Sequence, residues 1–343
     1  MIWIILPISI LIFVDLFIRI YGLRIGLSIF DRSLPFAARI GEEDPQCESF
    51  DFPSADGQVL LKGSILESHG DRPRGVVLFC HELGGNRWTA RHYCEGLLSA
   101  GFTVVTFDFS HHGESEARAG YGQVKWLTDY DVDDVMGAME FIRTQPEWLD
   151  LPFYLFGVSK GAGAALSAAA RTAHVSGVVV ESAYSTRRLM TLHVTRWLEY
   201  AVGRRAKKWI PRWHIEFSLA SIRWVSQRRH HCRYADLERD LAALRFTPIF
   251  WLSGAGDTYV KPSVIRELCE AAGGDPTADV WIVAGARHNS ARLQAPAEYD
   301  RRLVEFLERT GELVSDAVSP SAVNIKSLRK IPAQHASTAA DSI

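Results

Sequence analysis

The fold is constrained most strongly by a regular alternation of short apolar runs, rich in β-branched and aromatic residues, with longer segments of helical periodicity. The short runs occupy residues 76–80, 102–107, 153–156, 177–180, 248–252 and 280–283, and the helical segments occupy residues 88–98, 132–142, 162–170, 263–272 and 298–309. Strands that are separated by helices pair in parallel, with helices on both faces of the sheet. The chain is therefore predicted to form a doubly wound, mostly parallel α/β sheet, preceded by a hairpin around Asp56 and Gly57.

The chain is predicted to have four parts, of which the alternating segments form one. We expect an N-terminal helix at residues 1–24, a polar linker at 25–49, the α/β domain at 50–312 and a disordered tail at 313–343. With 343 residues, of which 47% are apolar and 23% charged, the chain can bury the core of one large domain.

Composition also bounds the function. The formal net charge of -2 gives no reason to expect nucleic acid as a partner. The five cysteines are scattered, and they form neither a CxxC pair nor a cluster with histidines at the spacing of a metal site. We therefore expect free thiols, no metal and no cofactor.

The first residues are predicted to form a membrane anchor. Residues 2–23 are mostly apolar, and a helix of this length spans about 30 Å of hydrocarbon. Asp15 and Arg19 oppose insertion, but they face each other on such a helix. No basic residue precedes the stretch and arginines follow it, so we expect an uncleaved single-helix anchor with the α/β domain in the cytoplasm. The alternative is an amphipathic helix that lies on a surface or packs on the domain itself.

The alternation is interrupted at residues 184–246, which we expect to form a helical cap inserted into the domain. Its central part, residues 187–233, carries twelve Lys and Arg against two Glu, a net charge of +10. The same part contains four tryptophans. This composition is typical either of an amphipathic surface that meets a membrane or of a cap whose aromatic residues fill its own core.

A serine nucleophile is predicted in the pattern Gly157-Val158-Ser159-Lys160-Gly161, between an apolar run and an Ala-rich helical segment. A serine on such a turn projects its hydroxyl above the sheet, and the helix N-terminus favours negative charge beside it. Serine needs a histidine base and an orienting carboxylate, which follow it in the order acid, then histidine. Asp257 and His288 each follow a predicted strand in that order. We predict a triad of Ser159, Asp257 and His288, with Glu181 as the alternative acid.

An oxyanion hole is predicted from the segment that follows the first central strand. Acyl transfer needs backbone N–H donors at this place, and we expect those of Leu83 and Lys160. His81, His111 and His112 precede the nucleophile, which is the wrong order for the base. We expect these three histidines to organise loops.

Five segments resemble the α/β-hydrolase superfamily, and the resemblance covers residues 50–306. The segments are HELGG at 81–85, DFSHHGES at 108–115, GVSKGA at 157–162, SGAGD at 253–257 and GARHN at 285–289. Within the superfamily, the chain is similar to the serine-aminopeptidase-like (S33) branch and to its membrane-anchored hydrolases of the Bem46 type. The resemblance implies esterase, thioesterase or lipase-like chemistry without a cofactor. Two positions depart from the family pattern: Glu82 replaces the usual glycine after the histidine, and Lys160 follows the nucleophile, as in acyl-CoA thioesterases.

We therefore expect a serine hydrolase that cleaves a carboxylic ester or related acyl bond of a small-molecule acyl or lipid substrate through an acyl-enzyme. One alternative is an acyl-CoA thioesterase whose basic insertion binds the phosphates of the carrier. Another is a non-catalytic, membrane-tethered interaction protein on a hydrolase scaffold. The acyl chain, the leaving group and the oligomeric state stay open.

Overall fold

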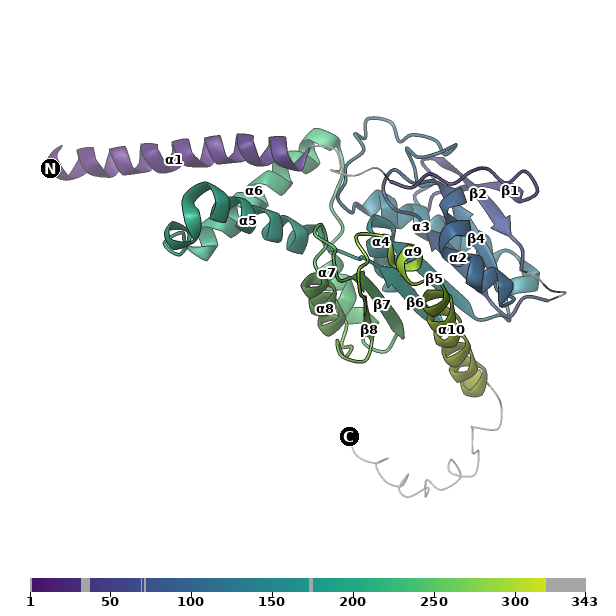
Figure 1. The fold of residues 1–343 in the computed structure, drawn as a ribbon. Coiled ribbons are helices and arrows are strands. Elements are labelled where there is room, and N and C mark those ends of the chain that lie inside the picture. Colours follow the sequence, from purple (N-terminus) through teal and green to yellow (C-terminus); the bar gives the residue numbers. More distant parts are fainter. Residues whose placement is uncertain (1, 32–37, 69, 71, 173–174, 319–343) are drawn as a thin grey trace, which may run out of the picture.

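The computed structural model describes residues 2–31, 38–68, 70, 72–172 and 175–318, and it is built around a single sheet (Figure 1). In this part of the chain, eight strands pair in the order β1-β2-β4-β3-β5-β6-β7-β8. β2 is antiparallel to β1 and β4, and every other pairing is parallel. The predicted mostly parallel α/β sheet is confirmed. The strands are β1 Glu48–Pro53, β2 Leu60–Leu66, β3 Val76–Cys80, β4 Thr103–Phe107, β5 Phe153–Val158, β6 Gly177–Glu181, β7 Ile249–Gly254 and β8 Val280–Val283.

Helices cover both faces of the sheet. α2 and α10 pack on one face, and α3, α4 and α8 pack on the other. The α-helices are α1 Ile2–Phe30, α2 Ala90–Ser99, α3 Asp129–Arg143, α4 Lys160–Ala169, α5 Thr186–Lys207, α6 Arg212–His230, α7 Leu237–Leu241, α8 Pro262–Ala271, α9 Ala291–Gln294 and α10 Pro296–Val318.

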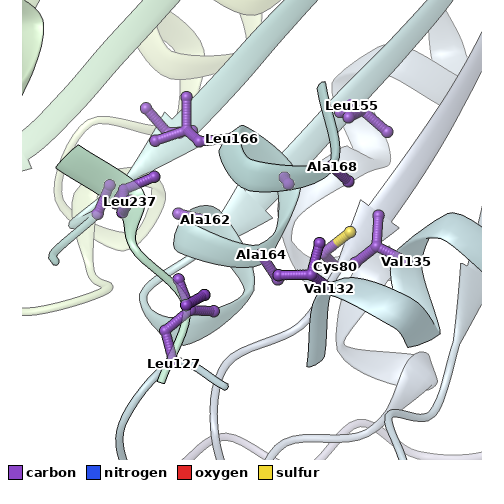
Figure 2. Close-up of a cluster of buried hydrophobic side chains, with 14 of the residues drawn as sticks. Cys80, Leu127, Val132, Val135, Leu155, Ala162, Ala164, Leu166, Ala168 and Leu237 are labelled. Carbon is purple, nitrogen blue, oxygen red and sulfur yellow. The ribbon is translucent and has the colours of Figure 1, made fainter. Parts of the chain in front are cut away.

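Side chains of the central strands alternate between two cores, one on each face. In β3, Leu78 and Cys80 belong to the core beneath α3 and α4, while Val77 and Phe79 belong to the core beneath α2 and α10. Figure 2 shows part of the first core around α4. Because both faces are covered, these strands need apolar side chains at nearly every position, which accounts for the continuous apolar runs in the sequence.

The N-terminal helix is longer than expected. α1 continues through residues 25–30 of the predicted linker to Phe30, and β1 then begins at Glu48. The reason is that the apolar pattern continues: Leu27 and Phe30 are buried in the first core. Glycine at position 26 allows this approach, because a Cβ there would lie 2.4 Å from Ile222 of α6.

Within the described residues, no helix combines the length and the apolar character that crossing a membrane requires. The predicted membrane-spanning anchor at residues 1–24 is therefore not supported. α1 instead packs along α6, which is the alternative that the sequence left open. The contact includes an ion pair of 2.8 Å between Asp31 and Arg229, and a separation of 3.3 Å between Asp15 Oδ1 and His214 Nε2.

The insertion at residues 184–246 contributes two long helices, α5 and α6, which form an arm beside α1 (Figure 1). The arm exposes its tryptophans, with exposed fractions between 41% and 85%. They are Trp197, Trp209, Trp213 and Trp224. The four tryptophans therefore do not fill a core of the cap, and the amphipathic surface that meets a membrane stays a prediction.

The C-terminal helix corrects the predicted tail. α10 extends to Val318, so residues 313–318 are helical, whereas the sequence predicts disorder from residue 313. Leu303 and Leu307 anchor this helix on the sheet, and extending an anchored helix adds a hydrogen bond for each residue that is ordered. Residues 319–343 of the predicted tail lie outside the described residues.

Candidate active site

The turn that carries Ser159 is as short as a strand-to-helix connection can be. β5 ends at Val158 and α4 begins at Lys160, so Ser159 alone makes the turn, with φ 53° and ψ -112°. A positive φ is strained for a serine, and such strain is typical of functional turns. A Cβ at position 161 would lie 2.2 Å from the Cys80 carbonyl oxygen, and one at position 157 would lie 2.5 Å from the Ala162 Cα. The two flanking glycines are therefore required by the geometry of the turn.

The structure brings the three predicted triad residues into one hydrogen-bonded chain. Ser159 Oγ lies 3.0 Å from His288 Nε2, and His288 Nδ1 lies 2.7 Å from Asp257 Oδ2. Asp257 is buried, and its Oδ1 accepts the N–H groups of Tyr259 and Val260 at 2.9 and 2.8 Å. These backbone donors fix the carboxylate on the far side of the imidazole. The arrangement is that of a nucleophile, a base and an orienting acid.

Glu181, the alternative acid, has a different set of contacts. Its backbone carbonyl accepts the Ser159 N–H at 2.8 Å, and its carboxylate accepts the Ala291 N–H at 3.0 Å and the Tyr299 hydroxyl at 2.9 Å. Burial raises the pKa of Glu181 to about 7. Glu181 therefore holds the turn of Ser159 and the segment after His288, while Asp257 makes the contact with the imidazole.

The two predicted oxyanion donors lie at the same end of the sheet. Lys160 is the first residue of α4, so its N–H is one of the donors that form the positive end of the helix dipole, next to Ser159. Leu83 lies in the loop after β3. This loop passes close to α4, because a Cβ at position 161 would meet the carbonyl oxygens of Cys80, the last residue of β3, and of His81. The arrangement suits stabilisation of an oxyanion, and the assignment of these two N–H groups stays a prediction.

The Lys160 side chain does not face the nucleophile. Its Nζ lies 2.8 Å from Asp131 Oδ1 and donates to the Val124 carbonyl at 3.0 Å. Both charged side chains are buried, with 5% and 8% of their surfaces exposed. The sequence pattern gave no signal for this pair, because Asp131 lies far from Lys160 along the chain. The ammonium group thus joins the start of α4 to the start of α3.

Glu82, which departs from the family pattern, lies between the oxyanion loop and the histidine loop. Its Oε1 accepts the Tyr93 hydroxyl at 3.3 Å, and that hydroxyl lies 3.5 Å from the Asn289 carbonyl oxygen, next to His288. The carboxyl group is buried, and burial raises its pKa. Its Oε2 makes no hydrogen bond within the part of the chain that the structure describes. Glu82 therefore packs against the site as a buried acid.

The three histidines that precede Ser159 act as hydrogen-bond acceptors in loops. His81 Nε2 accepts the Phe109 N–H at 3.2 Å, His112 Nε2 accepts the Gly84 N–H at 3.1 Å, and His111 Nε2 accepts the Arg118 N–H at 2.9 Å. Burial lowers the pKa of all three, that of His112 to about 2. Because neutral imidazole can accept at one nitrogen, the low pKa values preserve these contacts.

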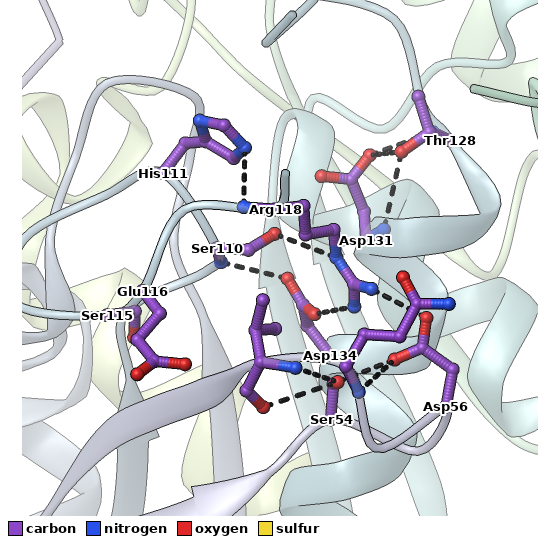
Figure 3. A network of polar contacts seen from close by, with 12 residues as sticks. Ser54, Asp56, Ser110, His111, Ser115, Glu116, Arg118, Thr128, Asp131 and Asp134 are labelled. Atoms are coloured by element: carbon purple, nitrogen blue, oxygen red, sulfur yellow. Dashed lines mark hydrogen bonds and ion pairs between the residues drawn. The ribbon is translucent and has the colours of Figure 1, made fainter. Parts of the chain in front are cut away.

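Sequence reasoning missed a buried ionic network behind these loops (Figure 3). Arg118 lies between Asp134 and Asp56, with a distance of 2.6 Å to each carboxylate. Burial raises the pKa of Asp134 to about 6. The clustering of charged residues around position 115 was the available signal. Elsewhere in the described part of the chain, the five cysteines are free thiols and no group of three His, Cys, Asp or Glu side chains is placed to hold a metal ion.

Comparison with known proteins identifies sequence relatives. Residues 71–235 match the family model described as serine aminopeptidase, S33. Over 129 residues, or 37% of this chain, the sequence is 39% identical to proteins of two Mycobacterium tuberculosis strains (CDC 1551/Oshkosh and H37Rv) that are described as putative phosphoribosyl transferases. The match spans only 28% of the length of those relatives.

Comparison with solved structures identifies the fold. An esterase of Pyrococcus furiosus superposes with a TM-score of 0.58 at 20% identity, over 81% of this chain and 98% of that chain. A lipase in its open form superposes with a TM-score of 0.54 at 16% identity, over 77% of this chain and 99% of that chain. The chain therefore has the α/β-hydrolase fold, and its residues 71–235 are similar to the S33 serine aminopeptidase family.

Proposed function

We propose that this protein is a serine hydrolase that cleaves a carboxylic ester or a related acyl bond through an acyl-enzyme. The observation that carries the proposal is the hydrogen-bonded chain from Ser159 through His288 to Asp257, on a strained turn between strand and helix. A hydroxyl on a strained, glycine-flanked turn is exposed to the reacting carbonyl, and a paired imidazole supplies the base that serine lacks.

In the proposed reaction, Ser159 Oγ attacks the carbonyl carbon while His288 Nε2 takes the hydroxyl proton. Asp257 keeps the imidazole oriented and stabilises its positive charge. The N–H groups of Leu83 and Lys160 bind the developing oxyanion. The carbon–leaving-group bond then breaks, and the leaving group takes the proton from His288. Water, deprotonated by the same imidazole, attacks the acyl-enzyme and releases the acid.

Hydrolysis of p-nitrophenyl butyrate tests this assignment. The wild-type protein is expected to hydrolyse the ester, and Ser159→Ala to lower kcat by about six orders of magnitude. Ser167→Ala is the matched control, because Ser167 is a buried serine on the same helix whose hydroxyl has no hydrogen-bond partner among the described residues. Equal activity of Ser159→Ala and Ser167→Ala would contradict the assignment and favour a non-catalytic role for the scaffold.

We also propose that the protein acts on lipid-like acyl substrates at a membrane surface, bound by α1 and the α5–α6 arm rather than by a spanning helix. The support is an exposed apolar surface, which we call the interfacial surface. Its residues are Ile5, Leu6, Ile10, Phe13, Leu16, Phe17, Ile20 and Tyr21 of α1, with Trp197, Tyr200, Trp209, Trp213, Phe217 and Trp224 of the arm. Tryptophan and tyrosine are favoured where headgroups meet acyl chains.

The two parts of the interfacial surface are held together and carry positive charge. The Arg19 guanidinium lies 4.9 Å from the Phe217 ring centroid and 5.6 Å from that of Trp213, so α1 and α6 present one surface. Arg204, Arg205 and Lys208 are exposed next to it. Basic residues beside apolar ones match the anionic lipids of a cytoplasmic leaflet, which is the side we propose.

Sedimentation with vesicles tests the membrane proposal. The protein is expected to sediment with phosphatidylcholine vesicles that contain phosphatidylserine, and less with phosphatidylcholine alone. Replacing Trp209 and Trp213 together by serine should release it, whereas Phe246→Ser, which changes an exposed side chain outside this surface, should not. Failure of the wild-type protein to sediment with either vesicle would contradict the proposal.

A further inference from the structure

A small cavity lies where the start of α5 meets α6 and α7. Its volume is about 230 Å³, and its walls include Thr186 and Arg187 of α5, Arg223 and Gln227 of α6, and Glu238 of α7. Thr186, in the wall of the cavity, lies near a residue that contacts the triad. That residue is Ser182, which donates a hydrogen bond to Asp257 Oδ2. Because Thr186 follows Ser182 by four residues, the Cα atoms of Ser182 and Thr186 are at most about 14 Å apart.

Two guanidinium groups of the cavity, those of Arg187 and Arg223, lie outside the ion pairs found among the described residues. Neither Arg187 nor Arg223 forms an ion pair with any of the residues that the structure describes, although most other arginines near the sheet do. Arg223 is half-buried, and burial together with repulsion from Arg187 lowers its pKa despite the attraction of Glu238 and Asp236. Two like charges that repel each other, one of them half-buried and the other exposed, favour an anion between them.

The acidic residues of the cavity wall are engaged by other groups. Glu238 accepts a hydrogen bond from the Ser185 hydroxyl and lies 3.9 Å from the Arg188 guanidinium. Asp236 caps α7 by accepting the Arg239 N–H. Both carboxylates attract Arg223 through space, but neither forms an ion pair with Arg187 or Arg223.

The cavity also offers neutral donors. Thr186 is only 3% exposed, and its hydroxyl makes no hydrogen bond within the described part of the chain. The amide oxygen of Gln227 accepts the Tyr234 N–H at 2.7 Å. The amide nitrogen of Gln227 therefore points away from Tyr234 N and is available as a donor. Thr186 is also the first residue of α5, where the helix dipole favours negative charge. This buried hydroxyl therefore has a donor that a ligand in the cavity could engage.

We infer that this cavity binds a phosphate group on the leaving group of the substrate. The inference rests on the proposed hydrolase function and adds to it the chemistry of the leaving group. Two guanidinium groups, a hydroxyl and an amide nitrogen match the acceptor oxygens of a phosphate ester. The phosphate belongs either to a nucleotide carrier of a thioester or to a phospholipid headgroup, and in both cases the cavity binds the substrate without taking part in bond cleavage.

The test compares substrates that share an acyl group and differ in the leaving group. Arg223→Gln is expected to lower kcat/KM for a phosphate-bearing substrate about tenfold or more, mainly through KM, and to leave p-nitrophenyl butyrate within about twofold. Butyryl-coenzyme A and 1-butyryl-lysophosphatidylcholine are the two phosphate-bearing substrates, and the one that loses activity identifies the source of the phosphate. Arg266→Gln, which removes an exposed arginine of α8 outside the cavity, should change neither value.

Binding measured by calorimetry separates failure of the inference from failure of the proposed hydrolase. The wild-type protein should bind coenzyme A or glycerol 3-phosphate, and Arg223→Gln should abolish that binding whether or not Ser159 is catalytic. A wild-type protein that binds neither probe would overturn the inference. So would an Arg223→Gln variant that loses activity equally on substrates with and without phosphate.

Discussion

Replacement of Lys160 by methionine tests whether the residue beside the nucleophile acts through its backbone or through its side chain. The substitution keeps the N–H group that we assign to the oxyanion hole and most of the apolar volume of the side chain. It removes the ammonium that lies 2.8 Å from Asp131 Oδ1 and leaves that carboxylate buried without its partner. Breaking a buried ion pair in this way costs about 3–5 kcal/mol.

Asp131 also accepts the Thr128 N–H at the start of α3, so part of its hydrogen bonding survives and the lower end of that range applies. We therefore expect Lys160→Met to lower the free energy of unfolding by about 3 kcal/mol. For a domain of this size, the change corresponds to a reduction in Tm of roughly 5–10 °C. Differential scanning calorimetry measures it, with Lys208→Met, at an exposed position of the arm, as the control.

The double variant Lys160→Met/Asp131→Asn isolates the ion pair. Because asparagine carries no charge, it should recover about 1–2 kcal/mol of the loss. Ester hydrolysis per folded molecule should stay within about tenfold of wild type in both variants. Unchanged stability in Lys160→Met would refute the structural role of the side chain. Normal stability with lost activity would show that the ammonium group acts on the substrate.

Three further predictions concern the turn, the acid and pH. Gly161→Ala should lower ester hydrolysis at least about a hundredfold, because its Cβ would meet the Cys80 carbonyl oxygen. Gly163→Ala is the control. Its Cβ would meet the flexible Leu127 side chain at 3.1 Å, so its activity in the same assay should stay near that of the wild type. Asp257→Asn should lower kcat by about four orders of magnitude and Glu181→Gln by less than tenfold; the opposite ranking would exchange the two roles. Burial raises the pKa of Glu181 from 4.5 to about 7, so its contribution to stability is fully present below pH 4.5 and is lost as pH rises toward 7. Between pH 5 and 8, the Tm of Glu181→Gln should therefore fall less steeply with pH than the Tm of the wild type or of the control variant Glu312→Gln. Equal slopes in all three proteins would show that ionisation of Glu181 does not cause the pH dependence.

The sequence predicted the parts of the site that depend on local geometry. Gly157 and Gly161 indicated the turn of Ser159 because no larger residue fits there. Asp257 and His288 were found because parallel strands end at one edge of a sheet, so residues that follow different strands meet. These inferences need only the order of strands along the chain.

Contacts between distant segments left no comparable signal. The pairing of Lys160 with Asp131 and the exposure of the tryptophans in the arm depend on how helices pack, which a sequence pattern does not specify. The bounds of α1 and α10 were a different matter. The apolar residues at 25–30 and the helical periodicity beyond residue 309 were present in the sequence. Assigning residues 25–30 to the linker and residues 313–318 to the tail gave too much weight to the composition of the residues that follow them.

The most direct test of the proposed hydrolase is covalent labelling by a fluorophosphonate probe, with mass spectrometry to locate the adduct. A fluorophosphonate reacts with a serine whose hydroxyl is activated by a neighbouring base, and the distance of 3.0 Å between Ser159 Oγ and His288 Nε2 predicts that activation. We expect one adduct in the folded protein, on the peptide that contains Ser159, and none in Ser159→Ala. An unlabelled wild-type protein, or labelling that persists in Ser159→Ala, would contradict the assignment of Ser159 as the nucleophile.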